Sequence, residues 1–273
     1  MTISTLNQYC VILLAIANIF LPTLCYSTED YEPKATYYGS PYAKAFRVGA
    51  CGYGLYGKTV NEGHVTAVSH LYRNGTCCGA CYQVKCKGPD CSEEGVKVVA
   101  TDHAFTYEAD FILSAKAYAK MAKPGKEMEM LDCEYVDVEY ERISCNYPDK
   151  NVMVKVHEHS YFPHYLALVF LYQGGMYDIT AVEIYEWNHK VLKESLAFTL
   201  LAQRALEASQ EWKPCKRAYG AVWDIENPPK GQLTLRFYAC GGGSSEGKWM
   251  VASNVIPAYW KAGLALETSI HLS

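Results

Sequence analysis

Closely spaced cysteines constrain this chain more than any other feature. Six of its twelve cysteines fall between residues 51 and 91, in the motifs Gly49-Ala50-Cys51-Gly52-Tyr53 and Cys77-Cys78-Gly79-Ala80-Cys81-Tyr82-Gln83-Val84-Lys85-Cys86. Val98-Val99-Ala100-Thr101-Asp102 follows, and it is typical of a buried strand that ends on a carboxylate. The sequence therefore indicates either a metal cluster or a disulfide-bonded core next to an acidic side chain.

An apolar segment near the N-terminus favours disulfides. Residues 11–21 are almost entirely apolar, too short a run for a membrane span of about 20 residues but typical of a secretory signal peptide. We expect residues 1–26 to be removed and the mature protein to be secreted and extracellular, without stable membrane insertion. In an oxidising compartment such cysteines are more often disulfide-bonded than metal-bound. Cys78-x2-Cys81 also lacks a second pair at zinc-site spacing, so we expect no metal and no cofactor.

Two β-rich domains are predicted. Residues 35–146 contain short strands and one helix that begins at Ser114 and stops before Pro124, which indicates a small irregular β-barrel. Residues 151–271 contain seven or eight alternating segments separated by Gly and Pro turns, which is typical of a β-sandwich. Leucines and alanines at helical spacing in residues 189–210 predict a helical insertion.

Charge and tyrosine content narrow the class of partner. The net charge is −4, and no long basic block is present, so a nucleic-acid partner is not expected. The chain contains 23 tyrosines, whose flat amphipathic rings suit wet recognition surfaces, although most are expected to serve as strand residues. Asn74-Gly75-Thr76 is an acceptor sequence for N-glycosylation, so a glycoprotein is expected.

The combined motifs resemble those of plant expansins, over nearly all of the mature chain. In the first domain the resemblance rests on the motifs at 49–53, 78–86 and 98–102. In the second it rests on Asp178-Ile179-Thr180-Ala181-Val182-Glu183, Gly220-Ala221-Val222-Trp223 and Ile256-Pro257-Ala258-Tyr259-Trp260-Lys261-Ala262-Gly263. Within the superfamily, residues 110–114 and 218–223 are similar to the expansin-like B group. The resemblance implies a mainly β fold, a six-stranded double-psi β-barrel followed by an immunoglobulin-like β-sandwich.

The same resemblance implies which cysteines pair. The expected disulfides are Cys51–Cys78, Cys81–Cys145 and Cys86–Cys91; spacing alone does not decide between the possible pairings. Cys77, Cys133, Cys215 and Cys240 lie outside the family pattern. A bond between Cys215 and Cys240 across the second domain is one possible use of two of them.

The acidic residues argue against an enzyme. The first-domain fold is shared with inverting endoglucanases, which need two carboxyl groups roughly 6.5–9.5 Å apart. By resemblance Asp102 is one acid of the expansin groove, whereas the second position is Ile112, whose hydrocarbon transfers no proton. Asp110 and Glu108 are the possible substitutes. An alternative for Asp102 is a purely structural role, capping a turn.

The resemblance also assigns groove and binding-face residues. Thr36 and Tyr38 are candidate groove residues with Asp102, and Tyr37 is expected beside them on the floor. Tyr165 and Tyr219 match aromatic positions on the flat polysaccharide-binding face of the second domain. Trp212 is a further candidate for that face, whereas Trp223 and Trp260 are expected to be structural.

These features predict a secreted, monomeric plant cell-wall protein without a cofactor. It would bind wall β-glucans such as cellulose, or xyloglucan, and loosen the wall without hydrolysis by replacing contacts between polymers. Two alternatives remain open. One is a lectin-like wall-binding protein without loosening activity; the other is a weak glycoside hydrolase that uses Asp102.

Overall fold

The structure is a computed structural model, and it describes residues 31–38, 49–105, 108–186, 211–241 and 244–272. Contacts divide the chain into two compact units, residues 1–32 and 33–273, and the second unit contains both β-domains. Within the described residues, no helix is both long enough and apolar enough to span a membrane.

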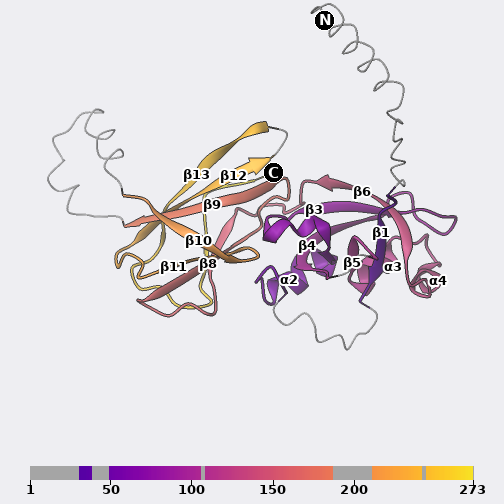
Figure 1. Ribbon diagram of the computed structural model, residues 1–273, viewed down its shortest axis with the longest axis horizontal. Coiled ribbons are helices and arrows are strands. Elements are labelled where there is room, and N and C mark those ends of the chain that lie inside the picture. Colours follow the sequence, from indigo (N-terminus) through magenta and orange to yellow (C-terminus); the bar gives the residue numbers. More distant parts are fainter. Residues whose placement is uncertain (1–30, 39–48, 106–107, 187–210, 242–243, 273) are drawn as a thin grey trace, which may run out of the picture. The chain divides into compact units, whose positions relative to one another are not determined.

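The first domain is a closed six-stranded barrel (Figure 1). Its strands are β1 (Lys34–Tyr37), β2 (Val65–Val68), β3 (Cys81–Cys86), β4 (Val96–His103), β5 (Phe111–Leu113) and β6 (Val136–Ile143). They follow the order β1-β5-β2-β4-β3-β6, and β6 pairs with β1 to close the barrel. The pairs β1–β5 and β2–β4 are parallel and the others are antiparallel. The predicted double-psi barrel class is confirmed by this topology.

Short helices cover the ends and one side of the barrel. They are α2 (Tyr56–Thr59), η2 (Val60–Gly63), η3 (His70–Gly75), α3 (Ala115–Lys120) and α4 (Glu127–Leu131). Helix α3 begins where the sequence predicts, because the Ser114 hydroxyl accepts the Ala117 N–H at 3.2 Å. It buries Tyr118 against the barrel core and contacts β1 and β5 (Figure 1).

Three disulfides stabilise the barrel, and they are the pairs that the family resemblance implies. These are Cys51–Cys78, Cys81–Cys145 and Cys86–Cys91. The other four cysteines of the described residues, Cys77, Cys133, Cys215 and Cys240, are free thiols. A Cys215–Cys240 bond is not formed. Cys215 lies in the sandwich core, whereas Cys240 follows the buried Ala239 and therefore faces the opposite side of its strand.

The second domain is an eight-stranded antiparallel β-sandwich. Its strands are β7 (Met153–Val156), β8 (Tyr165–Leu171), β9 (Tyr177–Glu186), β10 (Lys213–Tyr219), β11 (Val222–Glu226), β12 (Leu233–Gly241), β13 (Ser244–Ile256) and β14 (Ala265–Glu267). They follow the order β13-β12-β9-β10-β11-β8-β7-β14. The predicted sandwich class is confirmed.

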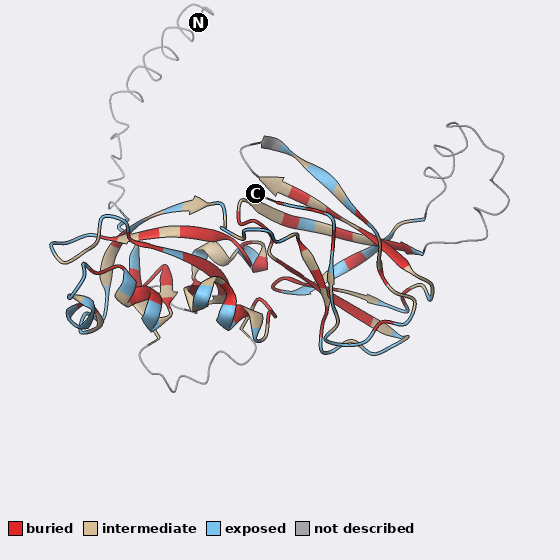
Figure 2. Cartoon of the chain, turned by 180° about the vertical axis from the view of Figure 1, so that it is seen from behind, coloured by how far each residue is buried: buried red, intermediate tan, exposed pale blue. Residues whose placement is uncertain are grey.

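The sandwich divides into two layers at β10. Lys213 to Cys215 pair with β9, whereas Lys216 to Tyr219 pair with β11. The layer β11-β8-β7-β14 supplies Leu168 and Phe170 to the core, and the layer β10-β9-β12-β13 supplies Leu235 and Phe237. Along β12, buried core residues alternate with less buried ones (Figure 2), so this layer presents one face to the core and one outward. Strand β8 is buried on both faces, because Leu168 and Phe170 lie in the sandwich core and Val169 and Leu171 lie in the cluster shared with the barrel.

Specific contacts join the barrel to the sandwich. The Asp178 carboxylate accepts a hydrogen bond from the Arg142 guanidinium at 2.7 Å on one oxygen and one from the Arg73 guanidinium at 3.0 Å on the other. The buried Gln173 amide donates to the Tyr53 hydroxyl at 3.0 Å. The Cys51–Cys78 disulfide packs with residues of β8 in one apolar cluster. Asp178, the first residue of the second-domain motif, therefore holds the sandwich to the barrel.

The predicted helical insertion at 189–210 lies outside the described residues. The strands that flank it, β9 and β10, pair with each other directly, with Lys213 opposite Ile184.

Candidate functional site

Four residues from four neighbouring barrel strands form one row across the barrel sheet. Thr36 on β1 pairs with Ile112 on β5, Ile112 pairs with Ala67 on β2, and Ala67 pairs with Asp102 on β4. Paired residues project to the same side of a sheet. This barrel row, Thr36, Ile112, Ala67 and Asp102, therefore brings together the groove positions that the sequence predicts on strands β1, β4 and β5.

The Asp102 carboxylate is held by backbone donors at one end of the barrel row. Its Oδ1 accepts the Ala50 N–H at 2.5 Å and the His103 N–H at 2.8 Å. Gly49 approaches the end of β4 so closely that a Cβ on it would lie 2.9 Å from the Thr101 carbonyl oxygen. Gly49 also has φ +38°, which favours glycine. The Gly-Ala-Cys motif thus positions the Asp102 carboxylate. By accepting the Ala50 N–H, this carboxylate also caps a turn, which is the alternative role that the sequence indicates for Asp102.

Tyr38 lies near Asp102, whereas Tyr37 does not belong to the groove floor. Burial and the Asp102 charge raise the pKa of Tyr38 far above its ordinary value, so the phenol stays neutral. Tyr37 pairs with the buried Leu113, donates to the Leu131 carbonyl at 2.6 Å and packs on Tyr118 at 4.8 Å. Successive strand residues alternate sides, so the expected position of Tyr37 beside Thr36 and Tyr38 is not what the structure shows.

The second position of the barrel row is a hydrocarbon, and the nearby acids are engaged. Asp110 is 2% exposed, accepts the Lys34 N–H at 2.9 Å and pairs with His70 Nδ1 at 2.8 Å. Glu108 is exposed and accepts the Tyr135 hydroxyl at 2.8 Å. Asp110 is thus a buried structural carboxylate rather than a solvent-facing partner for Asp102.

The outer face of the β11-β8-β7-β14 layer carries both predicted tyrosines. The Tyr165 hydroxyl donates to Asp224 Oδ2 at 2.7 Å, and the Tyr219 hydroxyl lies 3.3 Å from His157 Nε2. Burial, followed by the Asp224 carboxylate, raises the pKa of Tyr165 to about 12, so its ring is neutral at physiological pH. We call this pair, Tyr165 and Tyr219, the sandwich face.

The barrel and the sandwich face meet at Gly52. A Cβ on Gly52, which has φ +77°, would lie 3.1 Å from the Tyr219 ring and even closer to a Val222 methyl group. Only glycine permits this approach. The motif that holds Asp102 through Ala50 therefore also packs against the sandwich face two residues later.

Trp212 lies on the opposite outer face of the sandwich. Its ring packs on Tyr185 at 4.8 Å and is covered by the Arg236 guanidinium at 4.2 Å, which also covers Trp249 at 4.4 Å. Arg236 alternates with the core residues Leu235 and Phe237 and therefore points outward from the β10-β9-β12-β13 layer. The structure does not bring Trp212 together with Tyr165 and Tyr219.

The other tryptophans follow the sequence expectation. Trp223 is 5% exposed, lies in the sandwich core and is covered by the Arg217 guanidinium at 4.3 Å. Trp260 is 2% exposed in the same core. His157, which supports Tyr219, was not predicted. No local pattern marks it, because its contact with Tyr219 spans 62 residues.

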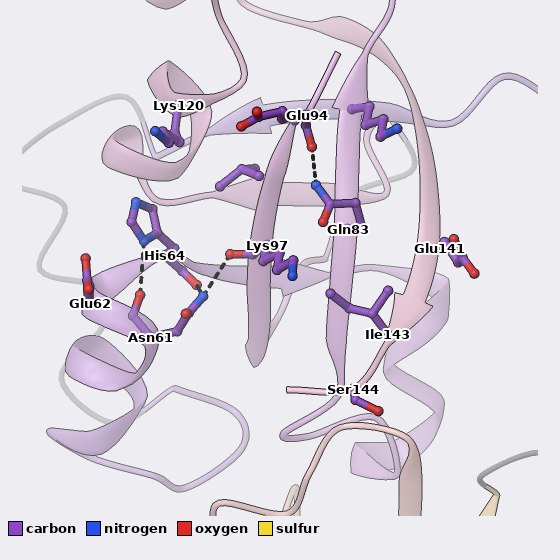
Figure 3. A pocket seen from close by; sticks show the side chains of 13 residues that line it. Asn61, Glu62, His64, Gln83, Glu94, Lys97, Lys120, Glu141, Ile143 and Ser144 are labelled. Carbon is purple, nitrogen blue, oxygen red and sulfur yellow. Dashed lines mark hydrogen bonds between the residues drawn. The ribbon is translucent and has the colours of Figure 1, made fainter. Parts of the chain in front are cut away.

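A hollow of about 730 Å³ on the barrel surface is separate from the residues of the barrel row (Figure 3). Its charged lining residues carry both signs: Lys85, Lys97, Lys120, Glu62, Glu94 and Glu141. Its amides are engaged, since Asn61 donates to the Lys97 carbonyl and Gln83 to the Glu94 carbonyl. It favours no particular charged ligand. Among the described residues, no group of three or more His, Cys, Asp or Glu side chains is arranged to hold a metal ion.

Comparison with known families matches both halves of the chain. A model described as the expansin C-terminal domain matches residues 152–257, and a double-psi barrel model described as lytic transglycolase matches residues 64–140. Expansin-like B1 of Arabidopsis thaliana is 47% identical over 93% of this chain and 94% of its own length. Expansin-like B1 of Oryza sativa subsp. japonica is 38% identical over 88% and 87%.

Solved structures share the fold. An expansin from Clavibacter michiganensis in its apo form aligns with a TM-score of 0.60 and 18% identity, over 88% of this chain and 96% of that protein. A variant of the same bacterial expansin, solved in complex with cellohexaose, aligns with the same score over 87% and 95%. At this identity the likeness concerns the fold alone.

Proposed function

The chain belongs to the expansin family, and we propose that it is a secreted, monomeric cell-wall protein that binds β-glucans or xyloglucan and loosens the wall without hydrolysis. The observation that carries this proposal is the close packing of Gly52 against Tyr219. It joins the Asp102 end of the barrel row to the aromatic sandwich face within one short motif. A bacterial relative solved with cellohexaose supports a cellulose-like ligand.

Binding would rest on two kinds of contact. The neutral rings of Tyr165 and Tyr219 offer apolar surface to the C–H faces of pyranose rings, at about 1–2 kcal/mol per stacked ring. The Asp102 carboxylate, half-buried beside Tyr38, accepts hydrogen bonds from sugar hydroxyls. Each contact replaces one between neighbouring polymers, so the chain weakens polymer adhesion without breaking a bond.

Hydrolysis is not part of the proposal because no second solvent-facing acid lies opposite Asp102 in the row. Ile112 holds that position, and Asp110 is buried and engaged by His70 and the Lys34 N–H. Inverting hydrolysis needs one carboxyl group to donate a proton and another to activate water.

The remaining expectations are proposed with this function. They are a signal peptide over residues 1–26, barrel and sandwich domains over 35–146 and 151–271, and an N-glycan on Asn74. Asn74 is exposed, as an acceptor must be. N-terminal sequencing and mass spectrometry of protein secreted from plant cells test the cleavage site and the glycan. Intact Met1 in the secreted protein would contradict cleavage of the signal peptide.

A binding assay tests the proposal. Purified protein is incubated with cellulose, with xyloglucan-coated cellulose and with starch as a control, and soluble reducing ends are measured in parallel. We expect retention on the first two and no reducing ends above background. Release of reducing ends that disappears in Asp102→Asn would favour the hydrolase.

A lectin-like role without loosening is the second candidate. It is favoured by Ile112, because this position of the barrel row offers no polar group that could contact polymer. This candidate predicts retention on wall polymers without any change in wall extension.

A further inference from the structure

Three aromatic rings stack on one another, and two of them, His103 and Phe105, follow shortly after Asp102 in the chain. His103 lies parallel to Tyr72, with ring centroids 4.1 Å apart and an interplanar angle of 8°. Phe105 packs against His103 with centroids also 4.1 Å apart, tilted by 53°. Two rings this close cannot share one face of the imidazole, so His103 is held between Tyr72 and Phe105. We call these three residues the aromatic stack.

The inner end of the aromatic stack is anchored to the Asp102 site. The Tyr72 hydroxyl donates to the Ala50 carbonyl at 3.0 Å, and the Ala50 N–H donates to Asp102 Oδ1. Tyr72 also packs against the buried clusters of the barrel and of the junction. The aromatic stack and the Asp102 carboxylate are therefore positioned by the same residue, Ala50.

The outer end of the aromatic stack is a phenyl ring in solvent. Phe105 is 90% exposed, more than any other large hydrophobic side chain among the described residues. A single exposed apolar side chain needs no explanation. This ring differs because it packs on His103, which in turn stacks on Tyr72, and because it lies three residues after Asp102 in the chain.

The surroundings define the ligand that such a ring would take. Aromatic rings offer an apolar surface to the C–H face of a pyranose, and a carboxylate nearby accepts sugar hydroxyls and repels other acids. Burial lowers the pKa of His103, so the imidazole in the stack is neutral at neutral pH. The chemistry therefore favours a neutral glycan over an acidic one.

We propose that Phe105 is a sugar-stacking residue that extends the Asp102 site and selects neutral β-linked glucan over polyuronides. This inference rests on the proposed function and adds a contact residue and a ligand class to it. The Cα atoms of Asp102 and Phe105 are at most about 11 Å apart along the chain. One oligosaccharide can therefore contact both residues.

Calorimetry with two ligands tests the inference. The affinity of the full secreted chain is measured for cellohexaose and for a hexamer of galacturonic acid. The variants are Phe105→Ala, Phe105→Trp, which keeps a ring, and Tyr259→Ala as a matched control. Tyr259 is 82% exposed and belongs to the sandwich. Thermal unfolding confirms that each variant folds; because Phe105 is exposed, no loss of folding is expected.

We expect Phe105→Ala to weaken cellohexaose binding about five- to thirtyfold, the loss of one stacked ring. Phe105→Trp and Tyr259→Ala should bind like the original chain, and the galacturonate hexamer should bind more weakly than cellohexaose. In saturation-transfer NMR, transfer from aromatic protons to sugar C–H protons should fall in Phe105→Ala.

Three results distinguish failure of the inference from failure of the proposed function. If the original chain binds cellohexaose and Phe105→Ala binds it equally well, the inference is wrong while the proposed function stands. Equal losses in Phe105→Ala and Tyr259→Ala would also overturn it, because the effect would not be specific to the aromatic stack. If the original chain binds neither hexamer, both the inference and the proposed glucan binding fail.

Discussion

Asp102 and Ile112 both pair with Ala67, from the two strands that flank it. Because neighbouring strands are about 4.8 Å apart, the Cα atoms of Asp102 and Ile112 lie about 10 Å apart. Both side chains project from the same face of the sheet as the Ala67 side chain. Asp102 therefore faces a hydrocarbon across this span, whereas inverting hydrolysis needs two carboxyl groups roughly 6.5–9.5 Å apart.

The Asp102 carboxylate should contribute to stability as well as to binding. Asp102→Ala removes the acceptor of two backbone N–H groups, so we expect the free energy of unfolding to fall by about 2 kcal/mol. Urea unfolding measures this. Asp132→Ala, at an exposed position, serves as the control and should change stability by less than about 0.5 kcal/mol. Equal effects of the two changes would contradict the capping role.

Substitutions on the sandwich face and at Trp212 should have different effects on retention on cellulose. Tyr219→Ala removes a ring from the sandwich face and should weaken retention on cellulose, whereas Tyr219→Phe keeps the ring and most of the binding. Trp212→Ala should leave retention unchanged, because Trp212 lies on the other outer face. It should instead cost about 0.5–1 kcal/mol of stability by exposing Arg236. Loss of retention in Trp212→Ala would show that the two faces act together.

Stability should fall in mild acid because buried histidines are kept neutral. Burial lowers the pKa of His157, which is 3% exposed beneath Tyr219. The unfolded chain then binds more protons below about pH 6.5, so this stabilisation is present above that pH and is lost as the pH falls. The pKa values of His64 and His103 are lowered in the same direction, again by burial. We expect each such group to contribute a slope of at most about 1.4 kcal/mol per pH unit.

His157→Gln tests this slope. The amide can still contact the Tyr219 hydroxyl but does not titrate between pH 7 and 5. Urea unfolding at pH 7, 6 and 5 should give a flatter dependence for the variant than for the original chain. Parallel curves would mean that His157 is protonated in the folded state as readily as in the unfolded chain.

Asp178 should hold the barrel against the sandwich. It is 15% exposed and pairs with both Arg73 and Arg142, so Asp178→Asn should lower the free energy of unfolding by about 1–2 kcal/mol, between the values for exposed and buried pairs. Glu129→Gln, in the exposed pair with Lys126, should cost almost nothing. A broader, two-step unfolding transition in Asp178→Asn would identify the junction as the weakened element. Unchanged unfolding would show that the apolar junction cluster suffices.

Local patterns predicted the elements that depend on local chemistry. The Ser114 cap, the small barrel, the sandwich and the buried Trp223 and Trp260 are of this kind, while the double-psi topology and the disulfide pairs came from the family resemblance. Strand alternation alone separates Tyr37 from Thr36 and Tyr38, and this signal was present in the sequence. The position of Trp212 depends on which layer β10 joins. The aromatic stack joins Tyr72 to residues about thirty positions later, so only the folded chain reveals it.

Extension of heat-inactivated plant wall strips under constant load tests the central claim most directly. Purified protein is added in mildly acidic buffer, with heat-denatured protein as the control, and released sugars are measured in the same bath. Wall loosening without hydrolysis predicts continued extension with no sugar release above background. Retention of the protein on the strips without extension would contradict loosening and leave a wall-binding protein, and extension accompanied by released sugars would contradict the non-hydrolytic mechanism.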